Sequence, residues 1–292
     1  YGLFANNIYD LSEQWILETG LRADYAQDWG FFPLPRVSLL FKPANGFSSR
    51  IGGGLGYKIP DIFTEEAEFN NYRNVLPIDK NNLEAERSYG ANFDMNYTTI
   101  LFDKISFSIN QLFYVTAIQN GLLLNSTNNG NLQFQNAKAS ILSKGTETNL
   151  KFTYKDFRWF LNYAFIDTRL SYLPENPQKP LTARHNAGSI LMYESEKWRI
   201  GYEPFYTGKQ VLSNGEETRD FITMGFLVMR NFKWITTYLN FENFTNIRQT
   251  NFSPLVFPPQ DSPTFTEIYA PTDGFIFSVG VIIKPFGNED ED

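Results

Sequence analysis

The sequence predicts an all-β fold, an antiparallel transmembrane β-barrel of which this chain supplies about thirteen strands. Three observations predict it. Long segments alternate between apolar and polar residues, the connections alternate between short and long, and aromatic residues make up 17% of the chain. The sequence has no apolar run near the roughly 20 residues that a membrane helix needs. A barrel strand contains no such run, because it exposes only every second residue to lipid.

The alternation is clearest in residues 84–97, where one parity carries Tyr89, Phe93 and Tyr97 and the other is polar throughout. A period of two is typical of a strand with two different faces. The same pattern recurs in 15–25, 47–58 and 104–117, and it predicts further strands near 1–11, 35–43, 138–155, 157–170, 183–194, 198–210, 219–230, 233–245 and 273–286. No segment shows a convincing helical pattern.

The connections between these strands indicate where such a barrel belongs. Short connections fall at 11–14, 43–46, 100–103, 154–157, 194–197 and 231–232, and long ones at 27–34, 59–83, 118–137, 171–182, 211–218 and 246–272. Short turns on one rim and long loops on the other are typical of bacterial outer-membrane barrels. We therefore expect the long loops to be extracellular and the C-terminus to be periplasmic.

Composition and charge limit the alternatives. The chain has 292 residues and no cysteine, which excludes a thiolate metal site and a disulfide. Its net charge is −7, so a nucleic-acid partner is not expected. Residues 1–286 are assigned to the barrel and 287–292 to an acidic, disordered tail. Tyr1 opens directly in a strand pattern, so we expect an N-terminal part outside this sequence.

Several short segments together resemble a known family. They are WILETGLRADY (15–25), PRVSLLFKP (35–43), GLGYKIPDIFTE (54–65), NNLEAERS (81–88) and NFENFTNIR (240–248). In this order and spacing they resemble the C-terminal half of TonB-dependent outer-membrane receptors of the kind common in Bacteroidetes. Ala85 stands where the family usually has proline, and Phe286 is followed by further residues instead of ending the chain.

The resemblance implies a barrel of about 22 strands closed by an N-terminal plug domain of the same protein. It implies outer-membrane lipid around the barrel and a TonB complex that acts through the missing N-terminal part. It also implies import of a scarce small-molecule ligand, most commonly a ferric siderophore, with a glycan or a corrinoid as other kinds. A surface lipoprotein is a further partner that the resemblance allows, and no cofactor is implied. The alternative function is a passive, porin-like outer-membrane channel.

Aromatic and charged residues in the long loops are the candidates for ligand binding, because exposed aromatic rings with converging polar groups suit a binding site. They are Trp29, Phe31, Phe32, Glu65, Glu66, Phe69, Tyr72, Arg73 and Phe134. The carboxylates of loop 59–83 could also hold a cation, although a solvated loop is the simpler interpretation. Loop aromatics that pack on their neighbours are an equal alternative to a ligand mouth.

Charged residues on the polar parity of the strands would line the lumen and face the plug. They are Glu18, Arg22, Asp24, Arg50, Lys58, Glu84, Glu86 and Asp94. Gly52, Gly54 and Gly56 share this parity and would leave room for the plug, which is a simpler interpretation than a phosphate loop.

No catalytic residues are predicted. A hydrolytic triad would have to use His185, the single histidine of the chain, and no nucleophile elbow accompanies it. The chain is therefore predicted not to be an enzyme. A soluble surface β-protein is a further alternative, which purification without detergent would support.

Overall fold

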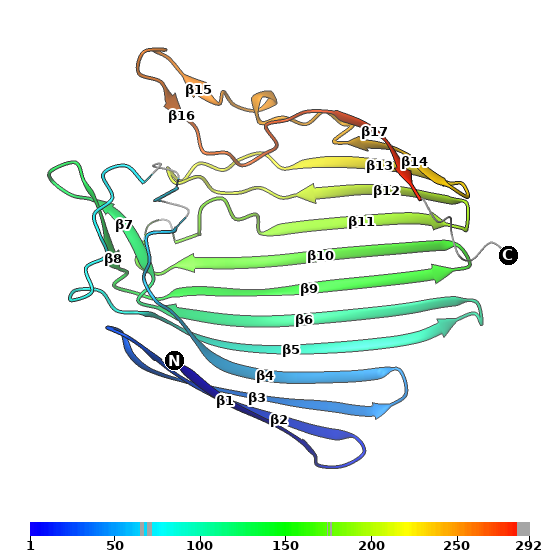
Figure 1. The fold of residues 1–292 in the computed structure, drawn as a ribbon, viewed down its shortest axis with the longest axis horizontal. Helices are drawn as coiled ribbons and strands as arrows, with labels where there is room; N and C mark the ends of the chain where they lie inside the picture. Colours follow the sequence, from blue (N-terminus) through cyan, green and yellow to red (C-terminus); the bar gives the residue numbers. More distant parts are fainter. Residues whose placement is uncertain (65–66, 69–71, 174, 176, 285–292) are drawn as a thin grey trace. The chain divides into compact units, whose positions relative to one another are not determined.

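The computed structural model describes residues 1–64, 67–68, 72–173, 175 and 177–284. Thirteen strands form one sheet in the order β1-β2-β3-β4-β5-β6-β9-β10-β11-β12-β13-β14-β17 (Figure 1). The predicted all-β fold and the predicted number of strands are therefore confirmed. Within the described residues, no helix has the length and apolar character needed to cross a membrane.

The bounds of most strands follow the predicted segments. The strands are β1 (Gly2–Asp10), β2 (Trp15–Ala26), β3 (Gly30–Ala44), β4 (Phe47–Lys58), β5 (Glu86–Leu101), β6 (Ile105–Gln119), β9 (Ile141–Tyr154), β10 (Phe157–Leu170), β11 (His185–Glu194), β12 (Trp198–Thr207), β13 (Phe221–Asn231), β14 (Ile235–Glu242) and β17 (Ile276–Ile283). However, β3 begins at Gly30 and not near residue 35. The long connection predicted at 27–34 is therefore wrong: it is a turn of three residues, 27–29, and Phe31 and Phe32 lie in β3 and not in a loop. Strand β1 pairs with β2 and β14 pairs with β17, both in antiparallel orientation.

Two long connections contain hairpins that the sequence pattern did not predict. β7 (Leu122–Ser126) pairs with β8 (Leu132–Asn136), and β15 (Val256–Phe257) pairs with β16 (Thr264–Phe265). A 3₁₀ turn, η1 (Gln249–Asn251), precedes the second hairpin. These segments are short and mixed in polarity, so period-two alternation does not distinguish them from loops.

The chain divides into two compact units. Unit 1 comprises residues 1–95, 112–145 and 167–179, and unit 2 comprises residues 96–111, 146–166 and the described part of 180–292. The boundary between the units falls inside β5, β6, β9 and β10, so each of these strands has residues in both units. Each unit is described separately below.

In unit 1 the strand register confirms two chemically distinct faces. Leu17 is opposite Leu39, which is opposite Ile51, so these apolar side chains share one face. Glu18 is opposite Ser38 and shares the other face with it. We call these the apolar face and the polar face. Large side chains remain exposed on the apolar face, as expected for a surface in contact with lipid.

Unit 2 has the same organisation. On its apolar face Trp159 is opposite Leu191, Leu191 is opposite Tyr202, and Tyr202 is opposite Phe226. Trp159 and Leu191 remain 42% and 45% exposed, although both are large and apolar. The opposite, polar face carries Asn162 among other residues. Direct cross-strand neighbours interact most strongly in a sheet, so the aromatic rows stabilise this register.

Candidate functional site

The long loops of unit 1 share one apolar cluster, which we call the loop cluster. Ala67, Leu83 and Phe134 form its centre and are 0%, 7% and 3% exposed. Partly buried residues packed around them are Trp29, Val75, Ile78, Leu122 and Leu124. The β2–β3 turn, loop 59–83 and the β7–β8 hairpin therefore form one packed platform.

Backbone hydrogen bonds join loop 59–83 to the hairpin. The Leu76 N–H donates to the Leu132 carbonyl, and the Leu132 N–H donates to the Asn74 carbonyl, both at 2.8 Å. The Asn136 side chain accepts from the Glu84 N–H at 2.7 Å and donates to the Asn120 carbonyl at 2.7 Å. The platform is thus held by its backbone as well as by apolar contacts.

The carboxylates of Glu84 and Glu86 bind the base of the same hairpin. The Asn120 amide donates to Glu84, and the Leu122 N–H donates to Glu86, each at 2.7 Å. Both acids were predicted to face the lumen. The structure shows that they have partners within this chain, and their role toward a plug stays a prediction.

Phe32, near the start of β3, is 1% exposed. Its ring stacks on Tyr57 with centroids 3.9 Å apart, and the Arg87 guanidinium lies 5.2 Å from its centroid. The Tyr57 hydroxyl donates to Asp24 at 2.9 Å. Strict alternation had assigned Tyr57 and Arg87 to the apolar parity, but the pairing of β3 with β4 ends at Arg36↔Gly54, before Tyr57.

Four of the predicted lumen charges share the polar face. Asp24 is buried, and its carboxylate binds the exposed Arg22 guanidinium at 2.8 Å. Glu18 accepts from the Ser38 hydroxyl at 3.4 Å. Arg50 is opposite Leu40, which is opposite Ile16, and this places Arg50 on the face of Glu18.

Three candidate ligand residues remain accessible. Phe31 is 58% exposed and Tyr72 is 41% exposed, and Arg73 is also exposed. The ring of Phe63, which sequence reasoning missed, meets the Tyr72 ring edge-on with centroids 6.2 Å apart. Trp29, Phe32 and Phe134 are packed instead, as described above.

The remaining candidates can be placed briefly. Lys58 is exposed at the end of β4, and Asp94 is half-buried in β5. Glu65, Glu66 and Phe69 lie outside the described residues.

Asp79 is a loop carboxylate that already has its own partners. The Asn82 amide donates to it at 2.7 Å, and the Asn81 N–H donates at 3.0 Å. These bonds, chiefly the one from Asn82, lower the pKa of Asp79 below its usual range. Next to it, the Lys80 ammonium binds Asp28 at 2.6 Å and so ties loop 59–83 to the β2–β3 turn.

Unit 2 carries a second set of interlocked loops. Gln249 is completely buried, and its amide donates to the Glu267 carbonyl at 2.8 Å while it accepts from the Tyr269 N–H at 2.8 Å. The Gln210 amide donates to the Tyr269 carbonyl at 2.9 Å and joins this loop to the β12–β13 loop. Sequence reasoning missed both glutamines, since a single polar residue in a loop carries no pattern.

His185 has a local partner at the start of β11. The Tyr163 hydroxyl lies 2.8 Å from His185 Nδ1, and the Phe165 ring centroid lies 5.2 Å from that of the imidazole. These contacts agree with a structural role for the histidine at the strand end.

Comparison with known proteins identifies the family of the chain and its fold. The sequence matches the family described as "TonB dependent receptor-like, beta-barrel" over residues 1–244. No curated protein matches the sequence. The family consists of outer-membrane transport receptors and not of enzymes.

Solved structures share the fold at low sequence identity. The siderophore receptor PirA from Pseudomonas aeruginosa has 15% identity and a TM-score of 0.69, with 96% of this chain and 45% of that chain covered. PirA from Acinetobacter baumannii has 15% identity and a TM-score of 0.71 at coverages of 96% and 45%. The FrpB iron transporter from Neisseria meningitidis has 16% identity and a TM-score of 0.67 at coverages of 96% and 44%.

The chain thus spans less than half the length of these structures. Its family match covers most of its residues, from the first strand to the end of β14. The chain belongs to the family of TonB-dependent receptor-like β-barrels.

Proposed function

We propose that the whole protein is an active outer-membrane receptor that binds a ferric siderophore outside the cell and imports it into the periplasm. The family membership supports transport powered by a TonB complex, with a plug domain of the same protein inside the barrel. The siderophore is proposed because solved structures similar to this chain include a siderophore receptor and a ferric enterobactin receptor.

The observation that carries the proposal is the packed loop platform of unit 1. A receptor needs a surface that keeps its shape before the ligand arrives, because ordering mobile loops on binding costs free energy. The buried centre formed by Ala67, Leu83 and Phe134 provides such a surface. We assign this platform to the extracellular side and the short turns and the C-terminus to the periplasmic side.

On this platform the accessible groups suit an anionic, aromatic ligand. Phe63 and Tyr72 present exposed rings, and Arg73 presents an exposed guanidinium. Guanidinium groups bind anionic oxygens through several hydrogen bonds, and aromatic rings stack on flat ligand groups. A ferric catecholate complex carries both features. Arg22, Asp24 and the other charges of the polar face would then meet the plug.

The test uses the full-length receptor in cells and radiolabelled ferric enterobactin as the probe. We expect specific binding, and we expect Arg73→Ala to weaken it about ten- to a hundredfold, the cost of a hydrogen bond to a charged group. Lys155→Ala, in the short β9–β10 turn, is the matched control and should leave binding unchanged.

Two results would contradict the proposal. One is that deletion of the gene leaves iron uptake from catecholate and hydroxamate siderophores unaffected and the purified receptor binds none of them. A large, constant conductance of the full-length protein in planar bilayers would instead support the passive channel.

A further inference from the structure

Basic residues gather at the short-turn end of the strands of unit 2. Residues 154–158, 194–199 and 230–234, in and beside the turns β9–β10, β11–β12 and β13–β14, carry six lysines and arginines against three acids. These turns lie at the same end of the strands (Figure 1). The β12–β13 loop at the other end, residues 208–220, carries two against three, and the whole chain has a net charge of −7. The excess of positive charge is therefore local to the short turns.

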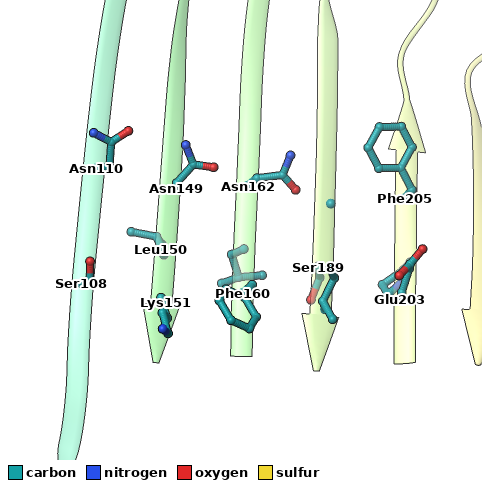
Figure 2. A pocket seen from close by; sticks show the side chains of 14 residues that line it. Ser108, Asn110, Asn149, Leu150, Lys151, Phe160, Asn162, Ser189, Glu203 and Phe205 are labelled. Carbon is teal, nitrogen blue, oxygen red and sulfur yellow. The ribbon is translucent and has the colours of Figure 1, made fainter. Parts of the chain in front are cut away.

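On the polar face, the basic residues near these turns bind a carboxylate of the same chain. Glu194 accepts from the Arg199 Nε–H at 2.8 Å and also binds the Arg158 guanidinium. Figure 2 shows the same face a few residues further along β9, where Asn149 and Lys151 project beside polar side chains of the neighbouring strands. A membrane barrel turns its polar face away from lipid.

On the apolar face, the partners of the basic residues are aromatic rings. Trp198 is opposite Arg230, at the ends of β12 and β13. This pair shares a face with the pair of Tyr202 and Phe226, because both strands advance by four residues between them. The Arg230 guanidinium carbon lies 4.8 Å from the Trp198 ring centroid and 4.8 Å from that of Phe232. Arg230 forms no hydrogen bond or ion pair with the residues that the structure describes, so its N–H groups can bind another molecule.

Two lysines in the turns have the same kind of partner. The Lys155 ammonium lies 5.5 Å from the Tyr154 ring centroid, and the Lys233 ammonium lies 5.9 Å from that of Trp234. Both rings are exposed. Exposed aromatic rings at the strand ends of a membrane barrel lie at the level of the lipid head groups, so the cations beside them lie there too. We call Lys155, Arg230 and Lys233 the cationic edge.

The chemistry of the cationic edge selects a ligand. Guanidinium and ammonium groups bind phosphate oxygens through charge-assisted hydrogen bonds, and stacking on a ring does not use their N–H groups. We propose that the cationic edge binds the phosphate head group of an anionic phospholipid, with Arg230 and Lys233 as its main contacts. The local excess of positive charge favours a lipid of net negative charge over a zwitterionic one.

Neither the lumen nor the missing part of the protein enters this inference. Arg230 lies on the face turned away from the lumen, and β13 has β12 and β14 as neighbours in the sheet. A plug domain, or strands added at the edges of the sheet, would therefore leave it accessible to lipid. Only the leaflet, the periplasmic one, rests on the orientation in the proposed function. Lipid binding and siderophore binding are measured separately, so one can fail without the other.

The experiment is native mass spectrometry of the full-length receptor in detergent, titrated with phosphatidylglycerol and, for comparison, with phosphatidylcholine of the same acyl chains. We expect tighter binding of phosphatidylglycerol. Arg230→Gln and Lys233→Gln should each weaken it about fivefold, the effect of one basic residue at an anionic membrane surface. The matched control is Lys151→Gln, because the Lys151 ammonium also lies beside a ring, 5.4 Å from the Phe160 centroid, but on the polar face. This variant removes the same charge and should leave lipid binding unchanged.

The outcomes are compared once heat-dependent mobility on gels shows that each variant is folded. Weaker binding of phosphatidylglycerol to Arg230→Gln and Lys233→Gln, but not to Lys151→Gln, supports the inference. Equal affinity of the wild-type receptor for the two lipids, or equal weakening in all three variants, overturns it. Binding that appears only after the acidic residues 289–292 are neutralised also overturns it, since the end of the chain would then occupy the cationic edge.

Discussion

Gln249 holds a long loop in place with one side chain. Its amide oxygen accepts from two consecutive backbone groups, the N–H of Tyr269 at 2.8 Å and that of Ala270 at 3.2 Å, and its amide nitrogen donates to the Glu267 carbonyl at 2.8 Å. The side chain is completely buried. A buried polar group that loses its partner costs about 1–3 kcal/mol, so this residue controls the order of the loop.

Replacing Gln249 by leucine should therefore lower the free energy of local unfolding of residues 246–272 by about 2 kcal/mol or more, because three backbone groups lose their partner. Limited proteolysis of intact cells expressing the full-length receptor should show faster cleavage in this loop. Gln260→Leu is the control, since Gln260 is exposed in the same loop. Equal cleavage of the two variants would show that the Gln249 bonds do not order the loop.

From the hydrogen bonds of Asp79 we expect loop 59–83 to be destabilised by acid. The donors Asn82 and Asn81 hold its pKa below the ordinary value, so the folded loop favours the charged carboxylate. The resulting stabilisation is complete above the pKa of the unfolded loop and is lost as the pH falls through the lowered pKa. Hydrogen exchange of residues 79–83 should accelerate as the pH falls below about 4, the ordinary pKa of an aspartate side chain. In Asp79→Asn this acceleration should be absent, and its persistence would assign the effect to another group.

At the scale of elements, β6 and β9 are neighbours without a short turn between them. The β7–β8 hairpin separates them in the chain, so no turn sets their register. The side chain of Gln111 in β6 connects the two strands on the apolar face. Its amide donates to the Thr146 hydroxyl at 2.5 Å, and the Thr148 hydroxyl donates to its oxygen at 2.6 Å.

In the hydrocarbon core of a membrane, breaking one of these hydrogen bonds leaves a polar group unpaired, because lipid offers no replacement partner. Thr148→Val keeps the shape of the side chain but removes the donor to Gln111. We expect it to lower the unfolding free energy of the full-length receptor in lipid vesicles by about 1–3 kcal/mol, measured by urea titration. Thr153→Val, on the opposite parity of β9, should have a smaller effect. Equal effects would mean that the network does not stabilise the pair.

The two kinds of element differ in how far the sequence predicts them. Strands of the large sheet, such as β4 and β10, could be predicted because one face meets lipid and the other is polar. Residues along these strands therefore alternate between apolar and polar. The β7–β8 hairpin was missed because its partners are loop residues such as Val75 and Ile78, which lie far away in the sequence. Local alternation carries no information about such packing.

At the scale of the whole molecule, the proposed orientation can be tested with introduced cysteines, since residues 1–292 contain none and any cysteine elsewhere in the receptor can be replaced first. Single cysteines at Asn128, in the turn of the β7–β8 hairpin, and at Lys155, in the β9–β10 turn, probe the two ends of the strands. A membrane-impermeant maleimide should label Asn128→Cys in intact cells and Lys155→Cys only after the outer membrane is opened. The reverse pattern would invert the assignment.

The candidate site was predictable only in part, because alternation assigns a residue to a face but does not give its partners. The sequence placed Glu84 and Glu86 on a polar parity, but not against the base of the β7–β8 hairpin, 36 residues further along the chain. Long-range packing decides such contacts. Likewise, Trp29 and Phe31 are two residues apart in sequence, yet one packs in the loop cluster and the other is 58% exposed.

The insertion of a complete hairpin between two adjacent strands also has an evolutionary consequence. Because β6 and β9 keep their own cross-strand network and Phe134 holds the hairpin in the loop cluster, the exposed tip of the hairpin, residues 128–130, can change in length and sequence while the wall and the platform stay the same. On the extracellular side proposed for these loops, bacteriophages and antibodies would meet such segments first. Variation between strains should therefore accumulate at this tip, and a lineage could escape recognition there without rebuilding its barrel.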